Sequence, residues 1–285
     1  MRSFTLLGVV CLLAAGAVGC GAQTVSGAGD SGASAGRMRE VAEAWRGAEA
    51  ARLWREGFYP LEDVVRLPEG AFRTDADKQA YLTRNFALRG KLPGKAPEGR
   101  IRWADGTSRP VTPMTAQQAY ELLGKGSTGR KDPLTVTKAT FGEMTLLTSG
   151  GEARVPAWHF TIAGYDTPLQ RVAIRPAKSP EAPIDALTEV TDDSMPLHGL
   201  REVAEGGRSV TVRAGHGACD DGAAVDVLET RDSVVLSASI VGSGDGVCTK
   251  QLVIDPVTVR LERPLGGRIL LDAFTGAPVA LVAVP

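Results

Sequence analysis

The sequence has few of the residues that most often carry chemistry. It contains only three histidines and four cysteines in 285 residues. The cysteines show no Cys-x-x-Cys spacing, which argues against a metal or redox site built from paired thiols. No Walker loop occurs, and the acidic residues show no glycosidase signature. From local motifs we therefore predict no catalytic residue, no metal site and no cofactor.

A basic block is also missing. The chain carries 32 Lys and Arg against 33 Asp and Glu, for a net charge of −1. Because nucleic-acid binding needs clustered cations, we expect no nucleic-acid partner. Beyond the first twenty residues no apolar run reaches the length of a membrane-spanning helix. Hydrophobic residues make up 43% of the chain, which is typical of a folded globular protein.

The most informative segment is the N-terminus, which has the pattern of a secretory signal. Arg2 supplies a positive charge, residues 4–18 are almost purely apolar, and small residues lead to Cys20. The apolar stretch would span only about 22 Å as a helix, against about 30 Å of bilayer core. We therefore predict a cleaved signal peptide over residues 1–19.

The ending Ala17-Val18-Gly19-Cys20 resembles a bacterial lipobox, although Ala17 stands where Leu is commonest. The lipoproteins that this start resembles carry a diacylglyceryl group on the cysteine sulfur, and cleavage makes that cysteine the N-terminus. The resemblance implies lipidation of Cys20 and a protein anchored on the outer face of the cytoplasmic membrane. The alternative is ordinary secretion with cleavage near Ala22.

Composition divides the rest of the chain into further segments. Residues 20–37 are rich in Gly, Ser and Ala and have almost no apolar bulk, so we predict a flexible tether. Residues 38–182 are predicted to form an α+β domain. Prolines and acidic residues gather near 183–196, which we interpret as a linker, and residues 197–285 are predicted to form a β-rich domain.

Patterning predicts helices first and strands afterwards, an α+β fold. Apolar spacing predicts helices over 38–56 and from Asp75 to about Leu88, the second capped by Thr74 or Asp75. Thr115 and Gln118 have capping-box spacing and predict a helix to Leu123. Between the second and third of these helices, strand patterns near 100–103 and 110–111 flank a turn at 104–107, which predicts a small hairpin.

Strand patterns dominate from Leu134 onward. The segment after Val155 places Trp158, Phe160 and Ile162 on one face. Short strands separated by glycine turns follow residue 197, which predicts a sandwich or open barrel. We expect them at the following segments: 209–214, 223–230, 233–242, 248–254, 257–264, 268–274 and 278–284.

Cys219 and Cys248 remain after the signal and the lipid site are set aside. In an exported protein they are expected to form a disulfide, which closes a loop of about 29 residues and stabilises the fold by about 3–4 kcal/mol. The alternative is a pair of metal-binding or redox thiols, which clustered histidines would support.

His216 is the one histidine with carboxylates close by in the sequence, at Asp220 and Asp221. A histidine beside carboxylates in a glycine-rich loop can bind a metal or act as a base. Adjacent carboxylates point in different directions, however, so an exposed turn next to a disulfide explains the pattern equally. We retain His216, Asp220 and Asp221 as candidate ligand-binding residues.

Two stretches resemble a family of actinobacterial, Streptomyces-like exported lipoproteins whose activity is not established. They are the strand VPAWHFTIAG followed by LQRVAI, and VCTKQLVIDPVTVRLERPLGGRILLDAFTG. Those proteins share a Val-Pro-Ala-Trp-x-Phe strand and a cysteine-containing strand before Pro-Leu-Gly-x-Arg. The resemblance covers about residues 40–285, and it implies the lipoprotein location and the cysteine pair.

These features favour a non-enzymatic binding or interaction module of the cell envelope. Its expected partners are the membrane, through the lipid on Cys20, and an envelope protein or cell-wall ligand. The alternative is an exported hydrolase or metal-dependent enzyme with a site around His216 and Asp220. A stalk domain with a purely structural role is a third hypothesis.

Overall fold

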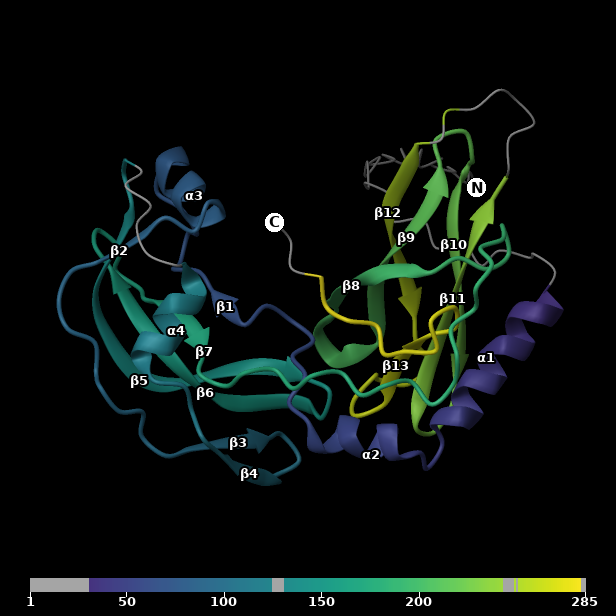
Figure 1. The fold of residues 1–285 in the computed structure, drawn as a ribbon, viewed down its shortest axis with the longest axis horizontal. Coiled ribbons are helices and arrows are strands. Elements are labelled where there is room, and N and C mark those ends of the chain that lie inside the picture. The colour runs from purple at the N-terminus through teal and green to yellow at the C-terminus, as the bar shows by residue number, and fades with distance from the viewer. Residues whose placement is uncertain (1–30, 125–130, 243–248, 250, 283–285) are drawn as a thin grey trace, which may run out of the picture.

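The computed structural model describes residues 31–124, 131–242, 249 and 251–282. Within these ranges the chain is mainly β with four α-helices, 17% helix and 41% strand, so the predicted α+β class is confirmed. Two lobes lie side by side in Figure 1, one containing β1–β7 and the other β8–β13. Residues 1–30, with the predicted signal peptide, Cys20 and most of the tether, lie outside the described residues.

The helices and strands have the following bounds. The helices are α1 Ser31–Trp45, α2 Glu49–Glu56, α3 Asp75–Leu82 and α4 Ala116–Leu123, with a short 3₁₀ turn at Glu205–Gly207. The strands of the first lobe are β1 Val65–Arg66, β2 Phe86–Leu88, β3 Gly99–Trp103, β4 Ser108–Val111, β5 Leu134–Thr148, β6 Gly151–Ile162 and β7 Leu169–Val172. Those of the second lobe are β8 Leu197–Val203, β9 Ser209–Gly217, β10 Gly222–Glu229, β11 Ser233–Val241, β12 Leu252–Arg260 and β13 Ile269–Asp272.

A long hairpin of β5 and β6 is the centre of the first lobe. One edge of β6 pairs with β3 at one end and with β7 at the other, while β5 lies along its opposite edge. The strand β5 is continuous over fifteen residues, in the region where strand patterns were predicted to begin. Trp158, Phe160 and Ile162 are all buried in one apolar cluster, as their alternation predicted.

The helix α4 begins with the predicted capping box. The Thr115 hydroxyl accepts the N–H of Gln118, and the Gln118 side chain accepts the N–H of Thr115. Its buried face, including Ala119 and Tyr120, packs against Trp158 and Phe160. The helix therefore covers one end of the sheet and leaves the region near β3 uncovered.

The predicted helix from Asp75 to about Leu88 is too long. Thr74 caps α3 as expected, but the helix ends at Leu82. Arg84 then adopts a left-handed conformation with φ of 55°, and residues 86–88 form β2, parallel to β5. Pairing with a strand almost fifty residues away makes residues 86–88 a strand, because local helix preference contributes little free energy compared with tertiary pairing.

Two three-stranded sheets build the second lobe, in the orders β10-β11-β13 and β12-β9-β8. Their inner faces share one apolar cluster, so the predicted sandwich describes their packing. The prediction of separate strands at 248–254 and 257–264 is wrong, because β12 runs through Pro256. Among the described strands β12 pairs with β9 alone, which makes it an edge strand, and an edge strand tolerates a residue without an N–H. Of the predicted strand at 278–284, the structure describes residues 278–282, and these show single bridges at Pro278 and Leu281.

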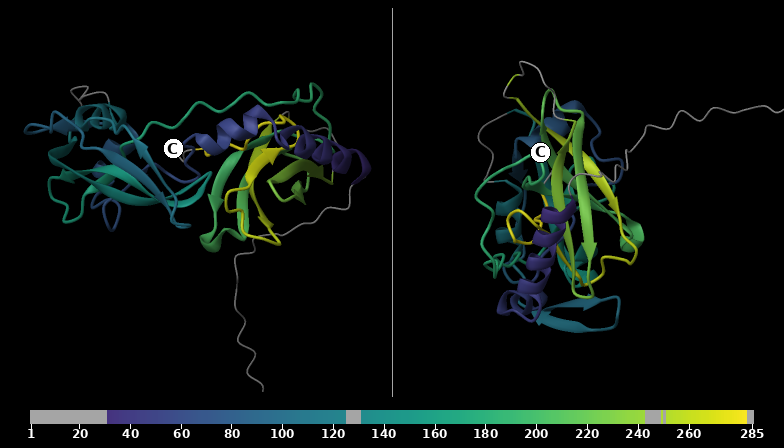
Figure 2. Two further views of the ribbon diagram at one scale, coloured as in Figure 1. Left: turned by 90° about the horizontal axis from the view of Figure 1, so that it is seen from below. Right: turned by 90° about the vertical axis from the view of Figure 1, so that its right-hand side faces the viewer.

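The two N-terminal helices pack on the second lobe, although the sequence placed residues 38–56 in the first domain. Val41, Trp45 and Trp54 share an apolar cluster with Val235 and Leu271 of β11 and β13. Figures 1 and 2 show α1 lying along these strands. The Trp45 indole N–H donates to the Gly276 carbonyl at 2.7 Å.

One helix over residues 38–56 is also a wrong prediction, because the chain turns between α1 and α2. Gly47 has a φ of +70°, a left-handed conformation that residues with a side chain rarely adopt. This conformation interrupts the helix. The first helix in turn begins at Ser31, so residues 31–37 of the expected tether are helical. The Arg37 Nε donates to the Ala273 carbonyl at 3.0 Å, a contact that joins α1 to the segment after β13.

The segment 183–196, interpreted as a linker, joins β7 to β8 and follows the surface of the second lobe. Leu187 donates its N–H to Phe274, and Met195 donates to Ala238 on β11. Ile240 of β11 donates to Asp192. These backbone bonds hold the connection against the sheet along much of its length.

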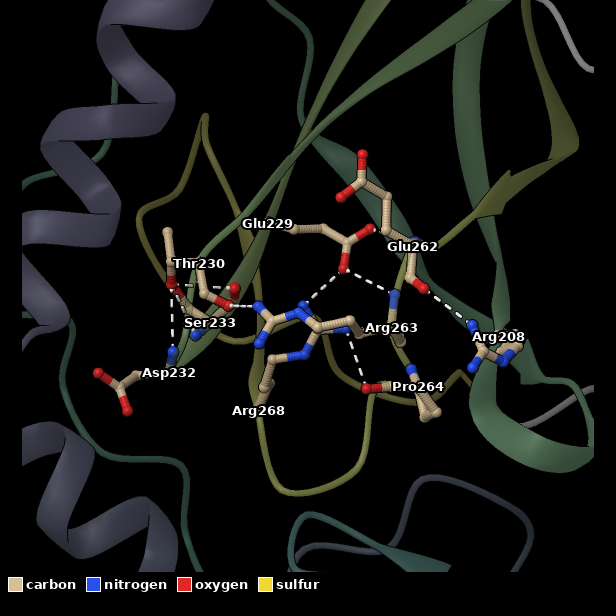
Figure 3. A network of polar contacts seen from close by, with 9 residues as sticks. All are labelled: Arg208, Glu229, Thr230, Asp232, Ser233, Glu262, Arg263, Pro264 and Arg268. Atoms are coloured by element: carbon tan, nitrogen blue, oxygen red, sulfur yellow. Dashed lines mark hydrogen bonds and ion pairs between the residues drawn. The ribbon is translucent and has the colours of Figure 1, made fainter.

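A buried ion pair fastens the loop between β12 and β13 (Figure 3). Arg268 Nη1 lies 2.7 Å from Glu229 Oε2, and the two side chains are 8% and 10% exposed. The Glu229 carboxylate also accepts the backbone N–H groups of Glu262 and Arg263, while Arg268 Nη2 donates to the carbonyls of Arg263 and Pro264. The backbone of the loop is therefore hydrogen-bonded to both members of the ion pair, the Glu229 carboxylate and the Arg268 guanidinium.

Across the described ranges, no helix combines the length and the apolar character needed to cross a membrane.

Candidate functional site

His216 forms a pair with a carboxylate that the sequence analysis did not consider. It lies near the end of β9, directly opposite Val253 of β12, and its ring is buried. Nε2 is 3.1 Å from Asp255 Oδ2, and Nδ1 is 2.8 Å from the Gly217 carbonyl. The antiparallel register brings the histidine and Asp255 together, a contact between residues 39 positions apart.

Both ring nitrogens of His216 lie within hydrogen-bond distance of oxygen atoms, one of the Asp255 carboxylate and the other of the Gly217 carbonyl. Burial lowers the pKa of His216, but the bonds to Asp255 and to the Gly217 carbonyl outweigh burial and raise the pKa above 6.5. Because each nitrogen already has a hydrogen-bond partner within the protein, neither is free to bind a metal or take a substrate proton in this arrangement. The geometry therefore points to a structural contact between β9 and β12.

Asp220 and Asp221 share a turn with His216, but their carboxylates do not converge on it. Asp220 Oδ2 accepts the N–H of Gly217 at 2.6 Å, which stabilises the turn between β9 and β10. The Asp221 carboxylate lies beside Gly242 instead. Within the described ranges, no three His, Cys, Asp or Glu side chains are grouped so that they could hold a metal ion.

Cys219 lies in the same turn, next to the strand that follows Cys248 in the sequence. Ala218 donates its N–H to the Gln251 carbonyl at 3.1 Å, so residue 219 lies beside the chain entering β12. Cys248 is outside the described residues, and the pairing stays a prediction.

A disulfide between Cys219 and Cys248 would make thermal stability sensitive to reduction. We expect dithiothreitol to lower the melting temperature of the protein by several degrees, since about 3–4 kcal/mol of loop closure is lost. The double variant Cys219→Ser, Cys248→Ser should melt at the lower temperature with or without reductant. A melting temperature that reduction leaves unchanged would contradict the bridge.

An open groove lined by charged residues lies in the first lobe, where β3 separates from β6. The two strands pair only at Arg102 with Arg154 and at Trp103 with Ala153. The next contact is lost because Pro156 has no N–H to offer on this edge. Its carbonyl, on the same edge, accepts the N–H of Ala173 beyond β7. The hairpin of β3 and β4 therefore arches away from the sheet.

The space under this hairpin is an open groove of about 740 Å³. Charges of both signs line it, and they are partly paired: Arg102 Nη1 donates to Glu143 Oε1 from β5, and Arg100 Nη2 donates to Ser108 at 2.9 Å. The floor is apolar in part. The residues that line it are Glu98, Gly99, Arg100, Arg102, Pro110, Val111, Thr112, Phe141, Glu143 and Pro156.

Sequence reasoning missed this groove because its lining comes from four strands. Nothing in the residues around Pro156 shows that β3 would leave the sheet at that point. Three of the tryptophans, Trp45, Trp54 and Trp158, do not line the groove and are buried in the apolar cores. Trp103 is partly exposed under the Arg109 guanidinium, 5.4 Å from the ring centre.

One serine motif also needs its structural context. Residues 32–36, Gly-Ala-Ser-Ala-Gly, have the spacing of a hydrolase nucleophile elbow. That elbow requires a sharp turn from a strand into a helix, whereas these residues lie within α1. The fold therefore does not present Ser34 as such a nucleophile.

No family model matches this chain, and neither curated proteins nor solved structures yield a match.

Proposed function

We propose that this protein is a lipid-anchored binding module on the outer face of the cytoplasmic membrane, without enzymatic activity of its own. The sequence supports the location through the lipobox-like ending at Cys20. The proposed partner is an envelope protein or a cell-wall ligand, held in the groove under the hairpin of β3 and β4.

The groove is the observation that supports binding most directly. It is open, two arginines and two glutamates line it, and Phe141 and two prolines add apolar contact area. Such a lining suits a polar partner with charges of both signs. An anionic group of the partner can pair with Arg102 in place of Glu143, and a cationic group can pair with Glu143 in place of Arg102. In the alternative enzyme His216 and Asp220 would be the reacting groups. His216 is instead hydrogen-bonded to Asp255, and Asp220 accepts the N–H of Gly217.

Photo-crosslinking from the groove tests this proposal. A benzophenone amino acid at Thr112, an exposed groove residue, is expected to capture one reproducible envelope component in living cells. The same probe at Gln117, exposed on α4 outside the groove lining, is the matched control. Equal capture patterns at both positions, or no capture at Thr112, would contradict a binding groove.

Charge reversal separates binding from folding in the same assay. Arg102→Glu should abolish capture at Thr112, since it removes a donor and places two carboxylates together. The double variant Arg102→Glu, Glu143→Arg restores an ion pair and thus the fold, but with the charges exchanged. We expect it to remain unable to capture the partner; full recovery would show that the ion pair serves only stability.

A further inference from the structure

The edge of β3 that faces β6, its inner edge, is only partly used by the sheet. Ala104 donates its N–H to Glu152 of β6, and Arg102 pairs with Arg154 along the same edge. Main-chain groups of an antiparallel strand point to its two edges alternately. Arg100, two residues before Arg102, therefore also directs its N–H and its carbonyl toward β6.

The sheet offers no partner to these two groups of Arg100. The register of β3 and β6 places Pro156 opposite Arg100, and a proline has no N–H for the Arg100 carbonyl. The Pro156 carbonyl accepts the N–H of Ala173 instead, at 2.8 Å. Among the described strands, β6 thus stops pairing with β3 where Arg100 would come next. The residue is exposed, so its main-chain groups are open to another molecule.

The unpaired groups of Arg100 open onto the groove of about 740 Å³. Phe141 and Glu143 of β5 line it on one side of this edge, and Arg102 lines it further along β3. A chain that lies along the inner edge would point every second side chain toward this lining, at a spacing of about 7 Å. The groove therefore combines a main-chain edge with side chains that an extended segment can reach.

Two contacts hold the hairpin of β3 and β4 in place beside the groove. Gly99 lies so close to two proline rings that an added Cβ would be 2.6 Å from Pro113 Cγ and 2.7 Å from Pro156 Cγ. On β4, Arg109 donates to two carbonyls at the C-terminal end of α2. The edge is thus positioned before a partner arrives, which lowers the entropic cost of binding.

We propose that the partner of the groove is a polypeptide, an extended segment of which adds as a strand to the inner edge of β3 at Arg100. This inference rests on the proposed function and names the class of partner. An open strand edge is a template for another chain: main-chain bonds supply affinity, and alternate side chains supply specificity. The lining favours an acidic side chain beside Arg102, a basic one beside Glu143 and an apolar one over Phe141.

Retention of a synthetic peptide pool on the immobilised protein tests strand addition. The pool is Thr-x-Thr-x-Thr-x-Thr, in which each x is Glu, Lys or Val and threonine favours the extended form. Mass spectrometry should show enrichment of peptides that carry both Glu and Val. Arg100→Pro should retain them about three- to tenfold less than Arg100→Ala, because both variants lack the guanidinium but only proline also lacks the N–H. Equal retention by the two variants, or no retention by the wild type, would overturn the proposal.

Amide hydrogen exchange of the wild type tests the same edge without a substitution. In the free protein the Arg100 amide should exchange much faster than that of Arg102, which is paired with β6. Saturation with the most strongly retained peptide should slow exchange at Arg100 about tenfold or more. An Arg100 amide that is protected in the free protein, or one whose exchange the peptide leaves unchanged, would contradict strand addition even if Arg100→Pro fails to fold.

The capture experiment at Thr112 separates this inference from the proposed function. Capture of a polypeptide that Arg100→Pro weakens more than Arg100→Ala supports both. Capture of a cell-wall glycan, with no peptide retained from the pool, would overturn strand addition and leave the binding groove intact. No capture at Thr112 would contradict the groove itself.

Discussion

Cys20→Ala is expected to move the protein from the membrane fraction to the soluble fraction. Lipid chains contribute about 0.8 kcal/mol per buried methylene, so the diacylglyceryl group that the resemblance implies would hold the chain firmly. Its loss should also abolish incorporation of a labelled fatty acid. No described helix could replace the lipid as a membrane span. Fractionation followed by immunoblotting measures the shift.

Cys11→Ala is the matched control for this experiment. Cys11 lies within the apolar stretch of the predicted signal, so the mature protein lacks it and its substitution should leave the location unchanged. Membrane retention of Cys20→Ala would contradict the anchor. Release of both variants alike would point to a defect of the signal rather than of lipidation.

Arg268→Met should cause the largest loss of stability among the substitutions considered. It leaves the Glu229 carboxylate charged, almost fully buried and without its cation, and it frees two carbonyls of the loop between β12 and β13. Breaking a buried pair from one side costs about 3–5 kcal/mol. The melting temperature should therefore fall by about 10 °C. Arg52→Met, which breaks exposed pairs on α2, is the control and should change it little.

The effect should depend on pH in a defined direction. Burial raises the pKa of Glu229, but the N–H groups of Glu262 and Arg263 together with Arg268 outweigh burial and leave the pKa below 4.5. A depressed carboxyl pKa stabilises the fold above pH 4.5, and the contribution is lost as the pH falls through the folded value. The difference in stability between wild type and Glu229→Gln should thus be large at pH 7 and shrink in acid. A constant difference would contradict this role.

Local chemistry was sufficient for several elements of the fold. The capping box of Thr115 and Gln118, the Thr74 cap and the hairpin turn at 104–107 each depend on residues within a few positions of one another. The alternation at Trp158, Phe160 and Ile162 likewise predicted a buried face, since side chains in a strand alternate with period two. The predicted location depends on residues 1–20 alone.

The candidate sites, in contrast, needed the tertiary structure. His216 was predicted beside Asp220 but pairs with Asp255 across the register of β9 and β12. The groove requires β3 to leave β6 at Pro156 and face Phe141 and Glu143 of β5, which no single segment encodes.

The sequence by itself determined the α+β class, the best-capped helices and the alternating strands, because these depend on short-range hydrogen bonding and periodicity. The tertiary structure decided where α1 and α2 pack, why residues 86–88 form a strand, and which charges meet in the interior. The pair of Arg268 and Glu229 shows the physical reason most clearly: the two residues are 39 positions apart, and only the packing of the loop between β12 and β13 against the end of β10 brings them together.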